Sequence, residues 1–201
     1  MSNLKKNIIF KRLEPHLYNN EINNSNIEKL LTSLRISKSE FFENFPKKID
    51  DLCFFYFENI YIKASKSVKR KNVNEKSISK KTNLFVSEFI KNFHYKKKAS
   101  IFFLSYGLLN PLLYSKALYN VSSNIWYDIG DKSTDFNYYT KRLILFNIIR
   151  NSLFYWRKTL DQKKTLNFSE RQVIFFGKLG KLKFETKKLL HNKLSFLSSK
   201  K

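Results

Sequence analysis

The sequence has 201 residues, of which 42% are hydrophobic and 16% aromatic, and it carries a formal net charge of +23. This apolar content excludes a disordered chain, and only 4 Gly and 3 Pro favour long helices over an all-β fold. The excess of Lys predicts a polyanionic partner, either nucleic acid or an acidic membrane, although a drift towards A- and T-rich codons explains it equally well.

The periodicity of apolar residues predicts an all-α protein. Ser37 and Glu40 form a capping box at the start of one helix, and Pro46 ends that helix. Pro111 is suited to the first turn of a later helix, and residues 100–109 are apolar on every side, as in a central buried helix. In the first predicted helix we expect Ile8, Ile9, Leu13 and Leu17 on the inner face. The predicted helical segments are 4–17, 27–34, 37–45, about 48 to beyond 62, 84–93, 100–109, 111–128, about 135–156 and 169–197.

Candidate metal ligands and membrane spans are scarce. Cys53 is the single cysteine, which excludes an internal disulfide, and its apolar neighbours predict a buried thiol. No His has a second ligand at metal-binding spacing. The most apolar segment, residues 99–114, is shorter than the roughly 20 residues that span a bilayer, and the N-terminal residues lack the apolar region of a signal peptide. We therefore expect a soluble protein that can touch a membrane.

Residues 36–52 resemble the helix-turn-helix of TetR-type repressors, which implies a TetR-like fold. Glu40 and Glu43 would oppose binding to phosphate, and Arg35 stands where the repressor pattern usually has a turn glycine. We therefore expect a degenerate helix-turn-helix, and DNA binding is not expected. The positions that match the repressor pattern are Ser37, Phe41, Phe42, Phe45, Pro46, Lys48 and Leu52.

With this resemblance the chain divides into three parts. Residues 1–62 form the part that is similar to a helix-turn-helix, and residues 84–201 form a larger helical ligand-binding part packed with it as one unit. Residues 63–83 between them are rich in Lys and Ser, which is typical of a solvated helix end or of a mobile connection.

The most specific motif lies between Gly130 and Arg142. A glycine turn leads into Ser, Thr and Asp residues that favour a helix start. Asp135, Tyr138 and Arg142 fall on a side of this helix where the apolar pattern does not require them. The apolar positions of the helix recur at intervals of three and four and share one face: Phe136, Tyr139, Leu143 and Phe146.

Together with Trp126 and Trp156, this motif closely resembles the signature of the ubiquinone-biosynthesis accessory proteins, the ninth member of the Coq series. The resemblance extends over residues 5–170 and implies a TetR-like fold that binds lipid in place of DNA. It implies a non-catalytic protein with no cofactor except a bound lipid, either an isoprenoid quinone intermediate or a phospholipid. Such a protein assists the di-iron hydroxylase that acts on demethoxyubiquinone, and both resemblances imply a homodimer.

The resemblance also implies where the partner and the membrane bind, and the Phe-rich interior offers a shelter for the lipid. The expected partner-binding residues are Asp135, Tyr138, Tyr139 and Arg142, with Tyr138 in place of the usual Trp. Burying a polyprenyl tail gains roughly 0.8 kcal/mol for each CH2 group, and the expected lipid-binding residues are Phe102, Phe103, Leu108, Leu109, Leu112, Ile125 and Phe146. The expected membrane-contact residues are Lys187, Lys188, Leu189, Leu190, Lys193, Leu194 and Leu197.

Bland alternatives exist for each of these sets. The Phe and Leu residues also fit an ordinary packed core, Asp135 a helix cap and Arg142 a surface ion pair. The alternative function is a TetR-type transcription regulator that binds DNA and a hydrophobic ligand, whereas no nucleophile–base pair or cofactor loop indicates an enzyme. The expected location is peripheral to the inner membrane, on the cytoplasmic face in a bacterium or the matrix side in a mitochondrion.

Overall fold

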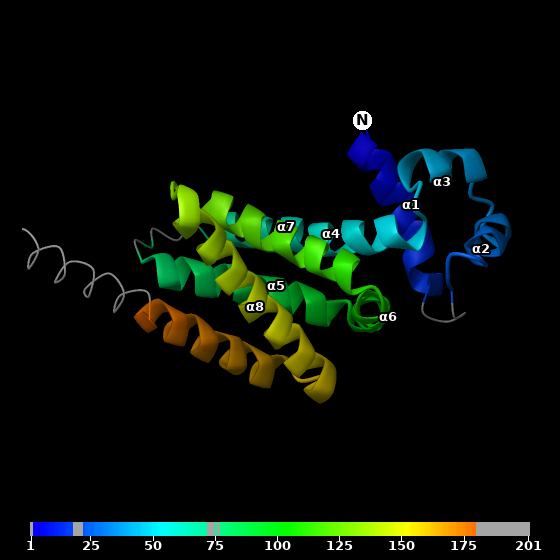
Figure 1. Ribbon diagram of the computed structural model, residues 1–201. Helices are drawn as coiled ribbons and strands as arrows, with labels where there is room; N and C mark the ends of the chain where they lie inside the picture. The colour runs from blue at the N-terminus through cyan, green and yellow to red at the C-terminus, as the bar shows by residue number, and fades with distance from the viewer. Residues whose placement is uncertain (1, 18–21, 72–74, 76, 180–201) are drawn as a thin grey trace, which may run out of the picture.

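A computed structural model describes residues 2–17, 22–71, 75 and 77–179. Every regular element within these ranges is an α-helix, which confirms the all-α prediction (Figure 1). The helices are α1 (Ser2–Leu17), α2 (Ile27–Ser33), α3 (Lys38–Asn44), α4 (Ile49–Arg70), α5 (Ile78–Tyr95), α6 (Lys97–Leu109), α7 (Pro111–Ile129) and α8 (Asp135–Thr159), and residues 162–179 are helical as well.

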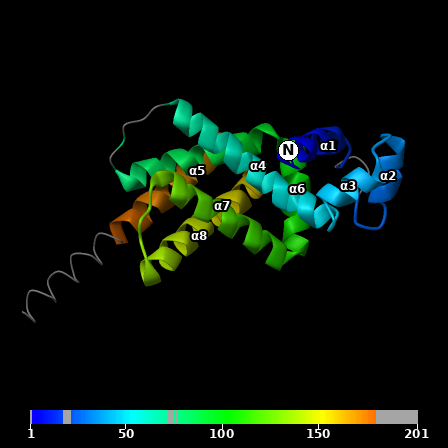
Figure 2. The same ribbon diagram turned by 90° about the horizontal axis from the view of Figure 1, so that it is seen from above.

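Helices α1, α2 and α3 gather at one end of the molecule in both views (Figures 1 and 2). Ser37 caps α3 as predicted, because its side chain accepts a hydrogen bond of 3.3 Å from the N–H of Glu40. Arg35, in the turn between α2 and α3, has a φ of 51°. This left-handed conformation favours glycine, and it occurs where the repressor pattern has its turn glycine. The TetR-like arrangement itself stays a prediction.

The body of the molecule is built from long helices that run back and forth. α4, α5 and α7 lie along one another, and α8 crosses them diagonally (Figure 1). α4 continues beyond residue 62 and ends at Arg70, so residues 63–70 are the end of a helix, one of the two alternatives for this segment. The helix that we expected from residue 169 already includes residue 162. The boundaries of the three predicted parts stay a prediction.

Two expectations about buried faces are wrong. α6 is not a central helix buried on all sides: Phe103 and Leu104 are fully buried, but Leu109 at its end is 83% exposed. In α1, Ile9, Leu13 and Leu17 face the core, whereas Ile8 is exposed. In both helices the neighbouring helices cover one side only, and that side takes the buried residues.

The predicted membrane-contact residues, from Lys187 to Leu197, all lie outside the described residues. Within the part that the structure describes, no helix combines the length and the apolar character that a bilayer span needs.

Candidate functional site

The corner between α7 and α8 is where the most specific motif of the sequence lies. Gly130 ends α7 with a φ of 85°, a left-handed conformation that costs glycine little. The N–H of Gly130 donates to the carbonyl of Tyr127 and that of Asp131 to the carbonyl of Trp126, both at 3.0 Å. These bonds close the end of α7 and place Asp131 beneath the first turns of α8.

The Asp131 carboxylate is the centre of the corner. It accepts hydrogen bonds from Lys141 Nζ at 2.7 Å, from the Ser133 hydroxyl at 2.6 Å and from Arg142 Nη1 at 3.2 Å. The side chains of Asp131 and Arg142 are only 3% and 1% exposed. Burial alone would raise the pKa of Asp131, but the hydrogen bonds from Lys141 and Ser133 outweigh it and lower the pKa to about 2. The carboxylate is therefore charged at neutral pH.

Arg142 fixes the position of Tyr138. Its Cζ lies 3.4 Å from the centroid of the Tyr138 ring, a cation–π contact. Its Nη1 donates to the Tyr138 carbonyl at 3.0 Å, and its Nε donates to the Ser123 hydroxyl at 3.2 Å. The prediction that Arg142 lies at the surface is wrong, both as a partner contact and as a surface ion pair. Its guanidinium lies beneath the tyrosines and supports them from inside.

Three tyrosines form the outer side of the corner, and we call them the corner surface: Tyr127, Tyr138 and Tyr139. The hydroxyl groups of Tyr127 and Tyr138 lie 3.2 Å apart, and the rings of Tyr138 and Tyr139 meet edge to face at 5.1 Å. Tyr127 and Tyr139 are about 60% exposed. The structure therefore places the rings of Tyr138 and Tyr139 in contact, while the side chain of Asp135, the first residue of α8, lies outside the described part. That these residues bind a partner stays a prediction.

Sequence reasoning missed Tyr127 and gave Asp131 no role. Asp131 could have been found, because a carboxylate beside the turn glycine lies within reach of basic residues in the first turns of the next helix. Tyr127 could have been found from the pattern of α7, where the buried residues Val121, Ile125 and Trp126 leave it on the outer side.

The predicted lipid-binding residues do not share one cavity. Phe103 and Ile125 are buried in the core, while Phe102 and Phe146 are partly buried against it. The Phe103 ring is fully buried and stacks on that of Tyr56 at 4.5 Å. The other three residues are exposed at the end of α6 and the start of α7: Leu108, Leu109 and Leu112.

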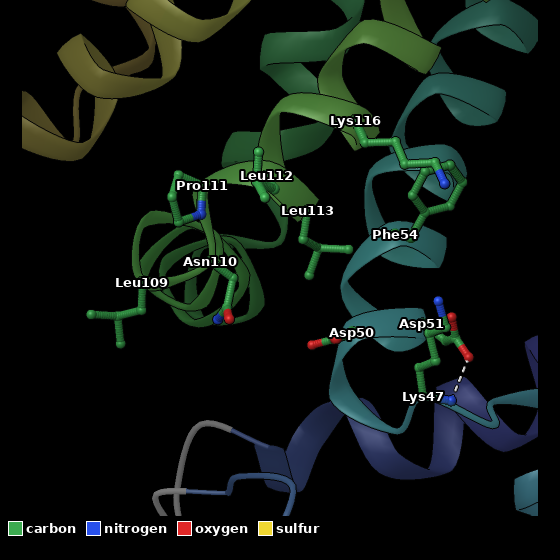
Figure 3. Close-up of a pocket in the computed structure, with 10 residues that line it drawn as sticks. All are labelled: Lys47, Asp50, Asp51, Phe54, Leu109, Asn110, Pro111, Leu112, Leu113 and Lys116. Carbon is green, nitrogen blue, oxygen red and sulfur yellow. Dashed lines mark hydrogen bonds between the residues drawn. The ribbon is translucent and has the colours of Figure 1, made fainter.

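A groove of about 660 Å³ lies between the start of α4 and the turn from α6 to α7. Figure 3 shows that Leu113 points towards α4 across this groove and that Lys116 extends towards the Phe54 ring. Two predicted lipid-binding residues, Leu109 and Leu112, lie at its edge. The lining residues are Lys47, Asp50, Asp51, Phe54, Leu109, Asn110, Pro111, Leu112, Leu113 and Lys116.

The described residues offer little reactive chemistry. No three His, Cys, Asp or Glu side chains among them are grouped so that they could hold a metal ion. Cys53 is a buried thiol as predicted, and burial, with a smaller contribution from Asp50, raises its pKa to about 12. A thiol with this pKa is a poor nucleophile at neutral pH.

Comparison with protein-family models matches residues 113–180 to the family described as COQ9. No curated protein and no solved structure matches the chain. The matched residues include nearly all of α7, the whole of α8 and the corner between them. The match confirms the resemblance predicted from the motif between Gly130 and Arg142, because residues 113–180, which include this motif, are similar to the COQ9 family.

Proposed function

We propose that this chain is a non-catalytic, lipid-binding accessory protein of ubiquinone biosynthesis. It holds an isoprenoid quinone intermediate and assists the di-iron demethoxyubiquinone hydroxylase at the membrane, as a homodimer. The observation that carries the proposal is that the residues matched to the family build the corner surface. A buried ion pair beneath this surface holds its tyrosines in place.

The corner surface supports the partner part of the proposal. Tyrosines are enriched among the residues that dominate the energy of protein interfaces. Because Arg142 already fixes Tyr138, and Tyr138 contacts both Tyr127 and Tyr139, little side-chain freedom is lost when a partner binds.

The groove beside the turn from α6 to α7 supports the lipid part of the proposal. Its volume of about 660 Å³ falls in the range of small-molecule sites. Phe54 and Leu113 give it an apolar wall, while Lys47 and Lys116 are charged groups at its rim. Such a groove suits an apolar tail with a polar head group near the entrance.

The alternative of a DNA-binding regulator receives no support. Lys38 and Ser39 are exposed on α3, but so is Glu43, whose carboxylate would repel phosphate. The ammonium of Lys38 is paired with Glu28 at 3.3 Å, which leaves it less available to a nucleic acid.

We expect Tyr139→Lys to weaken capture of the demethoxyubiquinone hydroxylase. Tyr139 is 60% exposed, so the change adds a charge to the corner surface without opening the core. Loss of an interface tyrosine costs about 2 kcal/mol or more when it is a dominant contact. We therefore expect about a thirtyfold rise in Kd, measured by pull-down and by titration.

The matched control is Tyr95→Lys, because Tyr95 is 84% exposed at the end of α5. This variant should bind the hydroxylase as the unchanged protein does. Equal affinity of the Tyr139 and Tyr95 variants would remove the corner surface from the proposal.

Organic extracts of the purified protein are expected to contain an isoprenoid quinone or its precursor, identified by mass spectrometry. Phe54→Lys replaces the aromatic ring in the wall of the groove with a charged side chain and should deplete this lipid severalfold, because the apolar tail loses surface against which it is buried. Tyr95→Lys again serves as the control. Extracts free of prenyl lipid, or equally loaded variants, would contradict lipid binding in this groove.

A further inference from the structure

The turn between α6 and α7 presents leucines to solvent, and we call it the elbow: Leu108, Leu109, Asn110, Pro111 and Leu112. Leu109 is 83% exposed and Leu112 is 88% exposed. Leu109 points away from α4, whereas Leu113 points towards it (Figure 3). Neither side chain is buried in the core of the described residues, and two leucines exposed to this extent at one turn offer an apolar contact to something outside it.

The elbow is held in a fixed shape. A side-chain Cβ at Gly107 would lie 2.9 Å from Cδ2 of Tyr114, so α6 and α7 approach this closely only because position 107 is glycine. The Tyr114 side chain is buried. The Asn110 side chain folds back onto α6, where its Nδ2 donates to the Tyr106 carbonyl at 2.9 Å. The exposed leucines therefore sit on a rigid corner of two helices.

Several backbone groups of the elbow are satisfied within the chain. The N–H of Asn110 donates to the carbonyls of Tyr106 and Gly107 at 3.1 and 3.0 Å, and its carbonyl accepts from the N–H of Tyr114 at 3.0 Å. Pro111 has no N–H to satisfy. These bonds fix the shape of the turn, whereas no side chain among the described residues caps the first N–H groups of α7, which stay directed towards water or lipid head groups.

Charges of both signs lie beside the elbow, and the charge of the whole chain favours an anionic surface. Asp50 accepts a hydrogen bond from the Tyr106 hydroxyl at 2.5 Å, and Asp51 accepts one from the N–H of Lys47 at 2.7 Å. Both donors are neutral, so the two carboxylates keep their charge and offset two lysines of the groove. Lys47 and Lys116 are exposed at the same groove and form none of the ion pairs among the described residues. The net charge of +23 adds a long-range attraction to acidic lipid.

We propose that the elbow inserts Leu109 and Leu112 into the surface of an acidic membrane, with Lys47 and Lys116 at the level of the head groups. Aliphatic side chains between lysines are typical of interfacial anchors, because the leucines enter the acyl boundary while the ammonium groups stay in water. Leucine is under-represented among the dominant contacts of protein interfaces, which favours lipid over a protein partner. The proposal needs no quinone and no hydroxylase.

A fluorescent probe on the full chain tests this insertion. Leu112→Cys is labelled with an environment-sensitive fluorophore, which spares Cys53 because that thiol is buried. The control is Tyr95→Cys, since α6 separates Tyr95 from the elbow. The probes are compared on vesicles of phosphatidylcholine and phosphatidylglycerol in equal amounts. We expect the probe at position 112 to shift to the blue and to be quenched by brominated acyl chains, and the probe at position 95 to stay unchanged.

Partitioning of a second variant gives an independent result. Leu109→Ser with Leu112→Ser should reduce the partition coefficient onto these vesicles by about tenfold or more, because burial of even one leucine side chain is equivalent to about that factor. Both side chains are exposed, so thermal unfolding should be unchanged.

The proposal is overturned if the fluorescence of the probe at position 112 does not change, or if the probe at position 95 changes equally. It is also overturned if the partition coefficient of the double serine variant is unchanged, because other segments would then bind the vesicles. Extracts free of quinone would contradict the proposed function and leave this inference intact.

Discussion

Asp131→Ala is expected to lower the free energy of unfolding by about 3–5 kcal/mol, the cost of breaking a buried ion pair by removing one partner. The Arg142 guanidinium, 1% exposed, would then lie in the protein without its carboxylate. Lys141 and the Ser133 hydroxyl would lose the same acceptor. Urea unfolding followed by circular dichroism measures the change.

Lys141→Ala is the matched control, because it removes the other cation on the same carboxylate. The Lys141 side chain is 36% exposed, so its ion pair is screened by water and its loss should cost about 1 kcal/mol or less. Equal losses for Lys141→Ala and Asp131→Ala would show that burial of Arg142 does not decide the stability of the corner.

The pH dependence of unfolding separates loss of the carboxylate charge from loss of packing. The folded-state pKa of Asp131 is lowered to about 2, whereas an unfolded Asp titrates near about 4. The ionised carboxylate therefore stabilises the protein above pH 4, and this contribution is lost as the pH falls from about 4 towards 2. The Asp131→Ala variant should lack this part of the acid destabilisation, and an identical acid profile would contradict the lowered pKa.

The sequence predicts well where several helices begin and end. Ser37 begins α3, Pro111 begins α7 and Gly130 ends it, all where the sequence indicates. Each of these signals acts within a few residues: a hydroxyl accepts a nearby N–H, a ring fixes φ, and a glycine adopts a left-handed conformation. The motif after Gly130 also predicts the similarity of residues 113–180 to the COQ9 family, because it is long and its residues are close in sequence.

Which side of a helix is buried could not be predicted in the same way. The sequence of α6 is apolar on nearly every side, so nothing in it separates the buried Phe103 from the exposed Leu109. In α8 the residues Phe136, Tyr139 and Leu143 share one face as predicted, but that face is the exposed one. The choice depends on which helices pack against each face, and those helices are distant in sequence.

The burial of Arg142 was equally hidden from the sequence. An Arg on an amphipathic helix is normally exposed. Here the turn after α7 brings the Asp131 carboxylate beneath Arg142, and this ion pair offsets the free energy that it costs to bury the guanidinium. The sequence therefore predicts Tyr138 and Tyr139 of the site, but it does not predict the buried residues that hold them in place. That support requires Ser123, Asp131 and Arg142 to meet from α7, the turn and α8.

Phe103→Ala is expected to lower the free energy of unfolding by about 3–5 kcal/mol, the range for removal of a buried aromatic ring from a filled core. Phe103 is fully buried, and its ring stacks on Tyr56 at 4.5 Å and on Phe10 at 5.9 Å. It therefore joins α1, α4 and α6. We expected a lipid contact for Phe103. If its ring lined an empty lipid site, its removal would lower the free energy of unfolding by much less.

Leu109→Ala on the same helix separates these two roles for the predicted lipid-binding residues. Leu109 is 83% exposed, so its truncation should change the free energy of unfolding by no more than about 0.5 kcal/mol. Urea unfolding of both variants, with equal m-values, measures the contrast. A small loss for Phe103→Ala, recovered when prenyl lipid is added, would place the lipid in the interior beside α6. A large loss that lipid does not restore means that the core is closed there, and the groove is then the remaining candidate among the described residues for the lipid site.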